Sequence, residues 1–285
     1  MKEDNLMKKT IATILTIIML FTLAVLPCCA QTDAPFYLVL GDSIAYGSGL
    51  NNPVEACYGK IVADTNGYEY SNRSVPGHTS TALIGVMSRE DVIEDIRKAD
   101  IINISIGGND FLTNNIIDLM FNAMVKKDYS RFDSIAEGFY SNLTTILEII
   151  NTHNEDAVVL IQSLYNPQSG HIRPAYQQGA DRINEALYRF SENNPGEIVI
   201  VDVASALGDD MANFAADEIH PSAKGNEIIA QQVLDTLYGL GLGKSTTPVI
   251  AEKGSDFDRP LMFSFYVRIF ATVFHVLGVI RGLFV

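Results

Sequence analysis

A serine, an aspartate and a histidine occur in this chain in an order that could support acyl transfer. Ser43 follows Gly41 and Asp42 directly after a short apolar run, where a tight turn into a helix would leave its hydroxyl exposed. A serine hydroxyl needs a base to become a nucleophile, and an imidazole oriented by a carboxylate fills that role near neutral pH. Asp217 and His220, three residues apart, are the candidate acid and base.

Two further segments carry groups that could stabilise the negative charge of an acyl-transfer transition state. The run Gly107-Gly108-Asn109-Asp110 follows a second apolar segment, and the side-chain amide of Asn109 is a suitable oxyanion donor. Gly77, in a short loop, could offer its backbone N–H, as could Ser43. The candidate oxyanion hole is therefore Ser43, Gly77 and Asn109.

Each of these residues also has an ordinary structural interpretation. Ser43 could be a turn residue or a helix N-cap, and the glycine-rich run could be a plain strand-to-helix turn. Asp217 and His220 could be an unrelated loop aspartate and surface histidine. Cys57 is interpreted as a small packed or half-exposed residue, with a catalytic thiol as the alternative.

Apolar runs precede the candidate residues and predict the strands that position them. Four continuous runs are typical of strands covered on both faces of a parallel sheet, at residues 36–40, 101–106, 157–161 and 198–203. Helical patterns separate or follow them, at residues 116–125, 135–151, 175–192 and 223–240. This alternation predicts a doubly wound α/β domain with its ligand site at the carboxyl ends of the strands.

The four segments, in this order, resemble the sequence blocks of the SGNH (GDSL-type) hydrolase family over residues 36–240. The blocks are Gly-Asp-Ser, an isolated glycine, Gly-x-Asn-Asp and Asp-x-x-His. Ile44 stands where the first block usually has leucine, which is a conservative change. No Gly-x-Ser-x-Gly surrounds Ser43, which argues against the nucleophile elbow of an α/β-hydrolase.

The resemblance implies a three-layer α/β/α, flavodoxin-like fold and hydrolysis of ester or related acyl bonds. It implies Ser43 as nucleophile with Asp217 and His220 as its acid–base partners. The implied oxyanion hole consists of the N–H groups of Ser43 and Gly77 and the amide of Asn109. No metal and no organic cofactor is expected.

Charge is distributed unevenly along the chain. The formal net charge is −14; residues 1–30 carry a net +1 and residues 259–285 a net +3, which leaves −18 on residues 31–258. Such an acidic body repels phosphate backbones, so nucleic acid is not an expected partner.

The N-terminal 30 residues have the three parts of a secretory signal peptide. Two lysines precede an apolar run over residues 11–26, and a small-residue exit follows. We therefore expect export, with an uncleaved membrane anchor as the alternative. Lipidation at Cys28 or Cys29 is a third alternative, but Pro27 stands where a lipoprotein signal usually has a small residue.

The C-terminal residues predict a second apolar segment. Residues 243–260 read as a linker, and residues 261–285 as an apolar helix. Its polar residues fall roughly along one stripe: Ser264, Arg268, Thr272, His275 and Arg281. Such a helix could lie in a membrane interface, cross the membrane, or dock on this domain or a second copy. Arg268 would be costly at a bilayer centre, which favours the interface over crossing.

These observations predict an exported serine esterase whose hydrolase domain covers residues 31–242. Its substrate is expected to be a lysophospholipid or other lipid ester, and the C-terminal residues 261–285 are the candidate membrane contact. One alternative is an esterase that removes O-acetyl groups from a cell-wall polysaccharide. The alternative of another class is a non-catalytic binding protein of the cell envelope.

Overall fold

Five parallel strands form the centre of the fold. The computed structural model describes residues 34–258 and 262–283, so the predicted signal segment lies outside the described residues. The described residues from Pro35 onward belong to one compact unit. The strand order is β2-β1-β3-β4-β5, where β1 is Phe36–Gly41, β2 Glu69–Asn72, β3 Ile101–Ser105, β4 Val158–Gln162 and β5 Val199–Val201.

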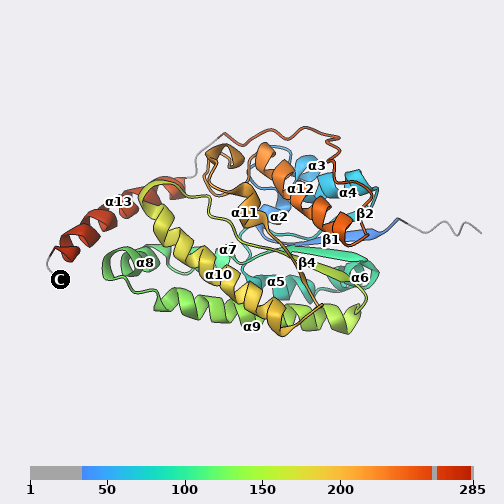
Figure 1. Ribbon diagram of the computed structural model, residues 1–285, viewed down its shortest axis with the longest axis horizontal. Coiled ribbons are helices and arrows are strands. Elements are labelled where there is room, and N and C mark those ends of the chain that lie inside the picture. The colour runs from blue at the N-terminus through green and yellow to red at the C-terminus, as the bar shows by residue number, and fades with distance from the viewer. Residues whose placement is uncertain (1–33, 259–261, 284–285) are drawn as a thin grey trace, which may run out of the picture. The chain divides into compact units, whose positions relative to one another are not determined.

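The predicted α/β fold class is confirmed, because the sheet is parallel and helices cover both of its faces (Figure 1). Successive residues of β1 point to opposite faces: Leu38 and Leu40 are buried in one core cluster, Tyr37 and Val39 in the other. This alternation explains why β1 is apolar throughout. β2 is an edge strand with partly exposed side chains, so its sequence carries a weaker apolar signal.

Helices pack on the two faces of the sheet as separate layers. One layer consists of α5 (Ser80–Met87), α6 (Glu90–Lys98), α9 (Ser130–His153) and α10 (Arg173–Asn193). The other contains α4 (Tyr58–Asn66), α11 (Val203–Leu207) and α12 (Ala223–Gly239). Short helices follow the strand ends: α2 (Ser43–Tyr46), α3 (Pro53–Ala56), α7 (Gly108–Leu112) and α8 (Ile116–Phe121).

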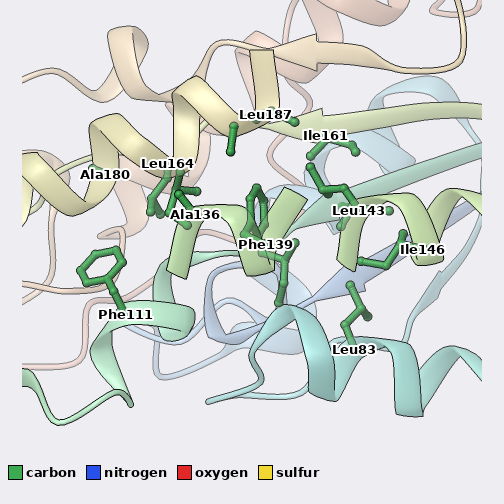
Figure 2. Packing of buried hydrophobic residues seen from close by; sticks show 14 of the residues in the cluster. Leu83, Phe111, Ala136, Phe139, Leu143, Ile146, Ile161, Leu164, Ala180 and Leu187 are labelled. Carbon is green, nitrogen blue, oxygen red and sulfur yellow. The ribbon is translucent and has the colours of Figure 1, made fainter. Parts of the chain in front are cut away.

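The larger core cluster is built around one face of α9 (Figure 2). Phe139, Leu143 and Ile146 are spaced by four and three residues, so they share one face of this helix. They are 1% exposed and pack in one cluster with Leu83 of α5 and Ile161 of β4. Burial of each such side chain contributes about 1.5–3 kcal/mol to folding, which anchors α9 and the neighbouring α10.

The helix predicted over residues 116–125 differs in the structure. α8 ends at Phe121 and continues as a π-helical turn over Asn122–Lys126. The wider turn leaves carbonyl groups available to another segment, and the guanidinium of Arg281 donates to the Val125 carbonyl at 3.2 Å. An apolar periodicity alone does not distinguish these two helix types.

The segment predicted as a linker contains no helix or strand over residues 243–258, yet hydrogen bonds attach it to the domain. Its Phe257 N–H donates to the Gly49 carbonyl at 2.7 Å, and the Asn51 N–H donates to the Ser255 carbonyl at 2.9 Å. Gly49 and Asn51 belong to the loop after α2, so this segment is hydrogen-bonded to the loop that follows Ser43 and its short helix.

The last helix, α13 (Met262–Gly282), packs beside α8 (Figure 1). Val267, Ala271 and Phe274 are buried in the core cluster. The ring of His275 stacks on that of His171 with 4.1 Å between centroids, and Arg268 pairs with Glu218. The opposite, solvent-facing side is apolar: Phe265, Tyr266, Ile269, Phe270, Val273, Val276, Leu277, Val279 and Ile280 are exposed.

Candidate active site

A tight turn at the end of β1 presents the Ser43 hydroxyl. Gly41 has a φ of 139°, and a side chain there would overlap the carbonyl of Ser105 on β3. Asp42 caps α2, because its carboxylate accepts the Ile44 N–H at 2.9 Å. Ser43 is therefore the first helical residue and not the cap, which leaves its hydroxyl available for another partner.

The structure brings Ser43, His220 and Asp217 together in one hydrogen-bonded series. Nε2 of His220 lies 2.9 Å from Oγ of Ser43, and Nδ1 lies 2.6 Å from Oδ2 of Asp217. With the Nδ1 proton donated to the carboxylate, Nε2 is the atom that can accept a proton from the hydroxyl. Ser43 and His220, 177 positions apart in sequence, thus have the geometry of a nucleophile and its base, with Asp217 as the orienting acid.

Backbone and side-chain hydrogen bonds hold Asp217 as an ionised acceptor. Burial would raise the pKa of Asp217, but the hydrogen bond and charge of His220 lower it, and so do the N–H groups of His220 and Ile219. These N–H groups donate to Oδ1 at 3.0 and 2.9 Å. The net result is a pKa below the usual aspartate value, so Asp217 remains negative near neutral pH.

Two residues after β4 support the turn that contains the acid and the base. The Tyr165 hydroxyl donates to the Ile219 carbonyl at 2.9 Å, and the Gln168 side chain donates to the Glu218 carbonyl at 2.8 Å. Glu218 has a φ of 54°, an uncommon conformation for a residue other than glycine. Sequence reasoning missed Tyr165 and Gln168; their position just beyond a predicted strand was the available signal.

The residues of the predicted oxyanion hole line one cavity. The Asn109 amide nitrogen donates to the His78 carbonyl at 3.0 Å and, over a longer distance of 3.5 Å, to Oδ2 of Asp42, which orients the amide at the cavity. Gly77 has a φ of 84° and lines the cavity above Ser43. The N–H groups of Ser43 and Gly77 donate to no acceptor within the described residues.

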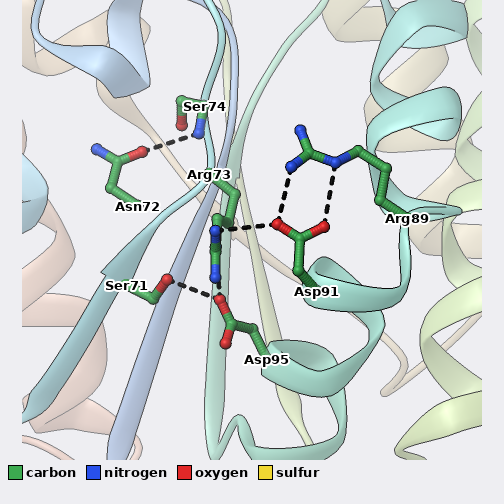
Figure 3. A network of polar contacts seen from close by, with 7 residues as sticks. All are labelled: Ser71, Asn72, Arg73, Ser74, Arg89, Asp91 and Asp95. Carbon is green, nitrogen blue, oxygen red and sulfur yellow. Dashed lines mark hydrogen bonds and ion pairs between the residues drawn. The ribbon is translucent and has the colours of Figure 1, made fainter.

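A network of polar contacts fixes the strand and loop that lead to Gly77 (Figure 3). The Arg73 guanidinium donates to Asp95 at 2.7 Å and to Asp91 at 3.2 Å, which connects the end of β2 to α6. Asn72 accepts the Ser74 N–H at 3.0 Å and donates to the Ala45 carbonyl of α2 at 2.8 Å. The loop is thereby tied to the short helix that begins with Ser43.

Asp42 is a buried carboxyl beside the nucleophile. Burial raises its pKa to about 7, although the Ile44 N–H and the charge of His220 act in the opposite direction and Asp110 raises it further. Its Oδ2 lies 3.5 Å from the Asn109 amide nitrogen. Asp42 is thus a second titratable group in contact with the oxyanion side of the site.

A cavity of about 350 Å³ opens over Ser43. Ser43, Gly77, Asn109 and His220 are among its lining residues, and the rest of its lining is largely apolar. The lining residues that sequence reasoning did not assign to the site include Leu112, Leu164, Tyr165, Tyr176 and Ile219. They come from α7, the segment after β4, α10 and the turn before His220, so four separate parts of the chain enclose this space.

Several other residues that could carry chemistry or contact an acyl chain lie outside this cavity. Cys57 is buried, with its sulfur 3.5 Å from the Tyr70 hydroxyl. Met120 and Met124 are buried in the core cluster. His78 contributes its backbone carbonyl to Asn109. Among the described residues, no three histidine, cysteine, aspartate or glutamate side chains gather as a metal site would require.

A parallel five-stranded sheet with a Ser–His–Asp arrangement at its carboxyl edge defines a serine hydrolase of the GDSL type. The chain belongs to the GDSL-like lipase/acylhydrolase family, which it matches over residues 39–228. The predicted family membership and enzyme class are therefore confirmed.

Individual proteins are similar to this chain in sequence or in fold. The chain is 26% identical over 212 residues to the spore germination lipase LipC of Bacillus licheniformis, covering 71% of this chain and 96% of LipC. The structure of the lipase Lip_vut3 from a goat rumen metagenome superposes with a TM-score of 0.60 at 22% identity, covering 74% of this chain and 99% of Lip_vut3. An extracellular lipase from Streptomyces rimosus gives a TM-score of 0.55 at 17% identity, over 71% and 99%.

Proposed function

We propose that this acylhydrolase cleaves lipid esters through an acyl-Ser43 intermediate, outside the cytoplasm and at a membrane surface. The observation that carries the substrate class is the largely apolar cavity of about 350 Å³ that begins at Ser43. An acetyl group would leave most of that space unfilled, whereas a longer acyl chain would bury its methylene groups against Leu112, Leu164 and Tyr176.

Catalysis follows from the distances between the three polar side chains. His220 Nε2, 2.9 Å from Ser43 Oγ, accepts the hydroxyl proton as the oxygen attacks the ester carbonyl. The negative charge that forms is stabilised by the N–H groups of Ser43 and Gly77 and by the Asn109 amide. Protonated His220, stabilised by Asp217, then gives its proton to the leaving alcohol; water, deprotonated by His220, releases the acid from Ser43.

Support for a membrane surface comes from the orientation of α13. A helix that docks on its own domain normally covers most of its apolar surface, but α13 packs one narrow side, with Val267, Ala271 and Phe274, against the domain and leaves a wider apolar side exposed. Only 17% of its window Phe265–Gly282 is buried, although this helix is long and apolar enough to span a membrane. Because Arg268 and Arg281 contact the domain, we place α13 parallel to the membrane in its interface.

Export of the protein is inferred from its sequence alone. Residues 1–30 have the pattern of a secretory signal, with an uncleaved anchor or lipidation at Cys28 or Cys29 as alternatives. N-terminal sequencing and mass spectrometry of the protein recovered from its host would distinguish a free cleaved terminus, an intact leader and an acylated cysteine.

The reaction is tested with p-nitrophenyl esters from acetyl to hexadecanoyl, using the full-length protein and its Ser43→Ala variant. We expect kcat/KM to rise with chain length beyond acetyl and to fall by about 10⁵-fold or more in Ser43→Ala. Ser141→Ala, on the exposed side of α9, is the matched control and should retain wild-type activity.

Two outcomes would contradict parts of this proposal. Cleavage of acetyl esters alone would support the O-acetyl esterase of a polysaccharide instead of a lipid esterase. If Ser43→Ala kept the wild-type rate, or if fluorophosphonate labelled a residue other than Ser43, the assigned nucleophile would be wrong.

A further inference from the structure

A small apolar void lies behind the cavity that contains Ser43. Its lining is aliphatic and aromatic and includes Ile116 and Met120 of α8 and Phe132 of α9. The void, about 10 Å³, has room for no more than one water molecule. The surrounding side chains offer no hydrogen-bonding partner for such a water apart from the tyrosine described next.

Tyr176 lines both the catalytic cavity and this void. Its ring packs edge-on against Phe111, with 4.9 Å between centroids and an interplanar angle of 78°, and it is 5% exposed. Burial, followed by the charge of Asp42, raises the pKa of its phenol. The ring is therefore a rigid partition, held by Phe111, between the two spaces.

We propose that the Tyr176 ring is the inner wall of the acyl cavity and sets the longest acyl chain that the enzyme binds well. This inference depends on the proposed acyl-Ser43 mechanism, which places the acyl chain in that cavity. A chain that reached past Tyr176 would enter only apolar surroundings, at Met120 and Phe132, so the barrier is the ring itself and not a polar group.

The test compares two substitutions that leave the rest of the site unchanged. Tyr176→Met keeps an apolar side chain of adaptable shape that can move aside for a ligand, whereas Tyr176→Phe keeps the rigid ring and removes only the hydroxyl. The measured quantity is kcat/KM for the dodecanoyl ester divided by kcat/KM for the butanoyl ester. This ratio does not depend on the fraction of folded enzyme, so partial unfolding cannot mimic the effect.

We expect Tyr176→Met to raise the ratio by about tenfold or more, since each additional methylene group in an apolar pocket is discriminated by about 10-fold or more. Tyr176→Phe should stay within about twofold of wild type. Addition of Met120→Phe to Tyr176→Met, which refills the void from behind, should return the ratio toward wild type. Should Tyr176→Met fail to fold, Tyr176→Leu carries the same expectation.

An unchanged ratio in Tyr176→Met, or an equal increase in Tyr176→Phe, would overturn the wall assignment. The proposed function fails separately, if the wild-type protein cleaves neither ester. The two failures are distinguishable because butanoyl hydrolysis by the wild type needs the catalytic residues but not the space behind Tyr176.

Discussion

At the scale of single residues, the surroundings of two carboxyl groups in the site shift their pKa values in opposite directions. Asp217 receives two N–H groups and the His220 imidazole, and its pKa lies below the usual aspartate value. Asp42 is buried beside Asp110, and its pKa is about 7. The first is suited to stabilise an imidazolium; the second changes charge close to neutral pH.

Asp42 should make folding stability depend on pH. Because its folded pKa of about 7 lies above the ordinary 3.8, the unfolded chain loses this proton first, and the free energy of unfolding falls as pH rises from about 4 to about 7. The total decrease is on the order of 4 kcal/mol. Asp42→Asn, which retains the cap oxygen for the Ile44 N–H, should lack this decrease in urea titrations at several pH values. A parallel pH dependence in both proteins would contradict the assignment.

Asn109 should contribute to the transition state and not to substrate binding. Replacement by alanine removes one oxyanion donor, so we expect kcat to fall by about 10²- to 10³-fold with little change in KM. Steady-state kinetics on a butanoyl ester measure both constants. Asn151→Ala, an exposed residue on α9 whose amide contacts Glu197, is the control with unchanged kinetics. An increase in KM at constant kcat would instead make Asn109 a substrate-binding residue.

At the scale of elements, α13 is connected directly to the turn that contains the catalytic acid. Arg268 pairs with Glu218 and also donates to the Ser169 hydroxyl at 2.8 Å. Glu218 immediately follows Asp217 in a left-handed backbone conformation. Movement of α13 would therefore displace the residues that hold Asp217 and His220.

The strength of this connection can be measured with a double-mutant cycle. Arg268→Gln and Glu218→Gln should show a coupling of about 1 kcal/mol or less in the free energy of unfolding, because the pair is partly exposed. The coupling should decrease at high salt. We also expect both variants to lose more activity on vesicle-bound lipid than on soluble butanoyl ester. Additive effects at low salt would mean that the pair does not link α13 to the catalytic turn.

At the scale of the whole molecule, the acidic body and the apolar helix predict how the protein meets a membrane. Residues 31–258 carry a net charge of −18, so anionic lipid should repel the domain. Burial of the outward side of α13 has to provide the attraction. Binding to zwitterionic vesicles should therefore be stronger than binding to vesicles with added anionic lipid, and it should persist at high salt.

Substitutions on the outward side of α13 test this prediction. Ile269→Glu combined with Val276→Glu places two charges on side chains that are 46% and 51% exposed, without contact to the core cluster. Vesicle co-sedimentation should fall by about tenfold or more, while hydrolysis of soluble butanoyl ester is retained. Val249→Glu, equally exposed at 51% but outside α13, is the control. Equal sedimentation of all three proteins would exclude α13 as the membrane contact.

The sequence by itself determined the features that depend on neighbouring residues. Apolar runs located β1, β3, β4 and β5, because strands buried on both faces must be apolar along their length. The spacing of Asp217 and His220 and the turns at Ser43 and Asn109 are also local patterns. Since parallel strands end at one edge of a sheet, these patterns were sufficient to predict one site.

Only the tertiary structure decided which distant side chains complete the site. Tyr165, Gln168 and Tyr176 carry no motif, and their roles depend on where α10 and the turn after β4 pack. The direction that α13 faces was also undetermined, because an amphipathic pattern identifies two sides of a helix but not which one meets the protein. Val267, Ala271 and Phe274 pack into the core cluster beside the pair of Arg268 with Glu218, which leaves the wider apolar side of α13 outward.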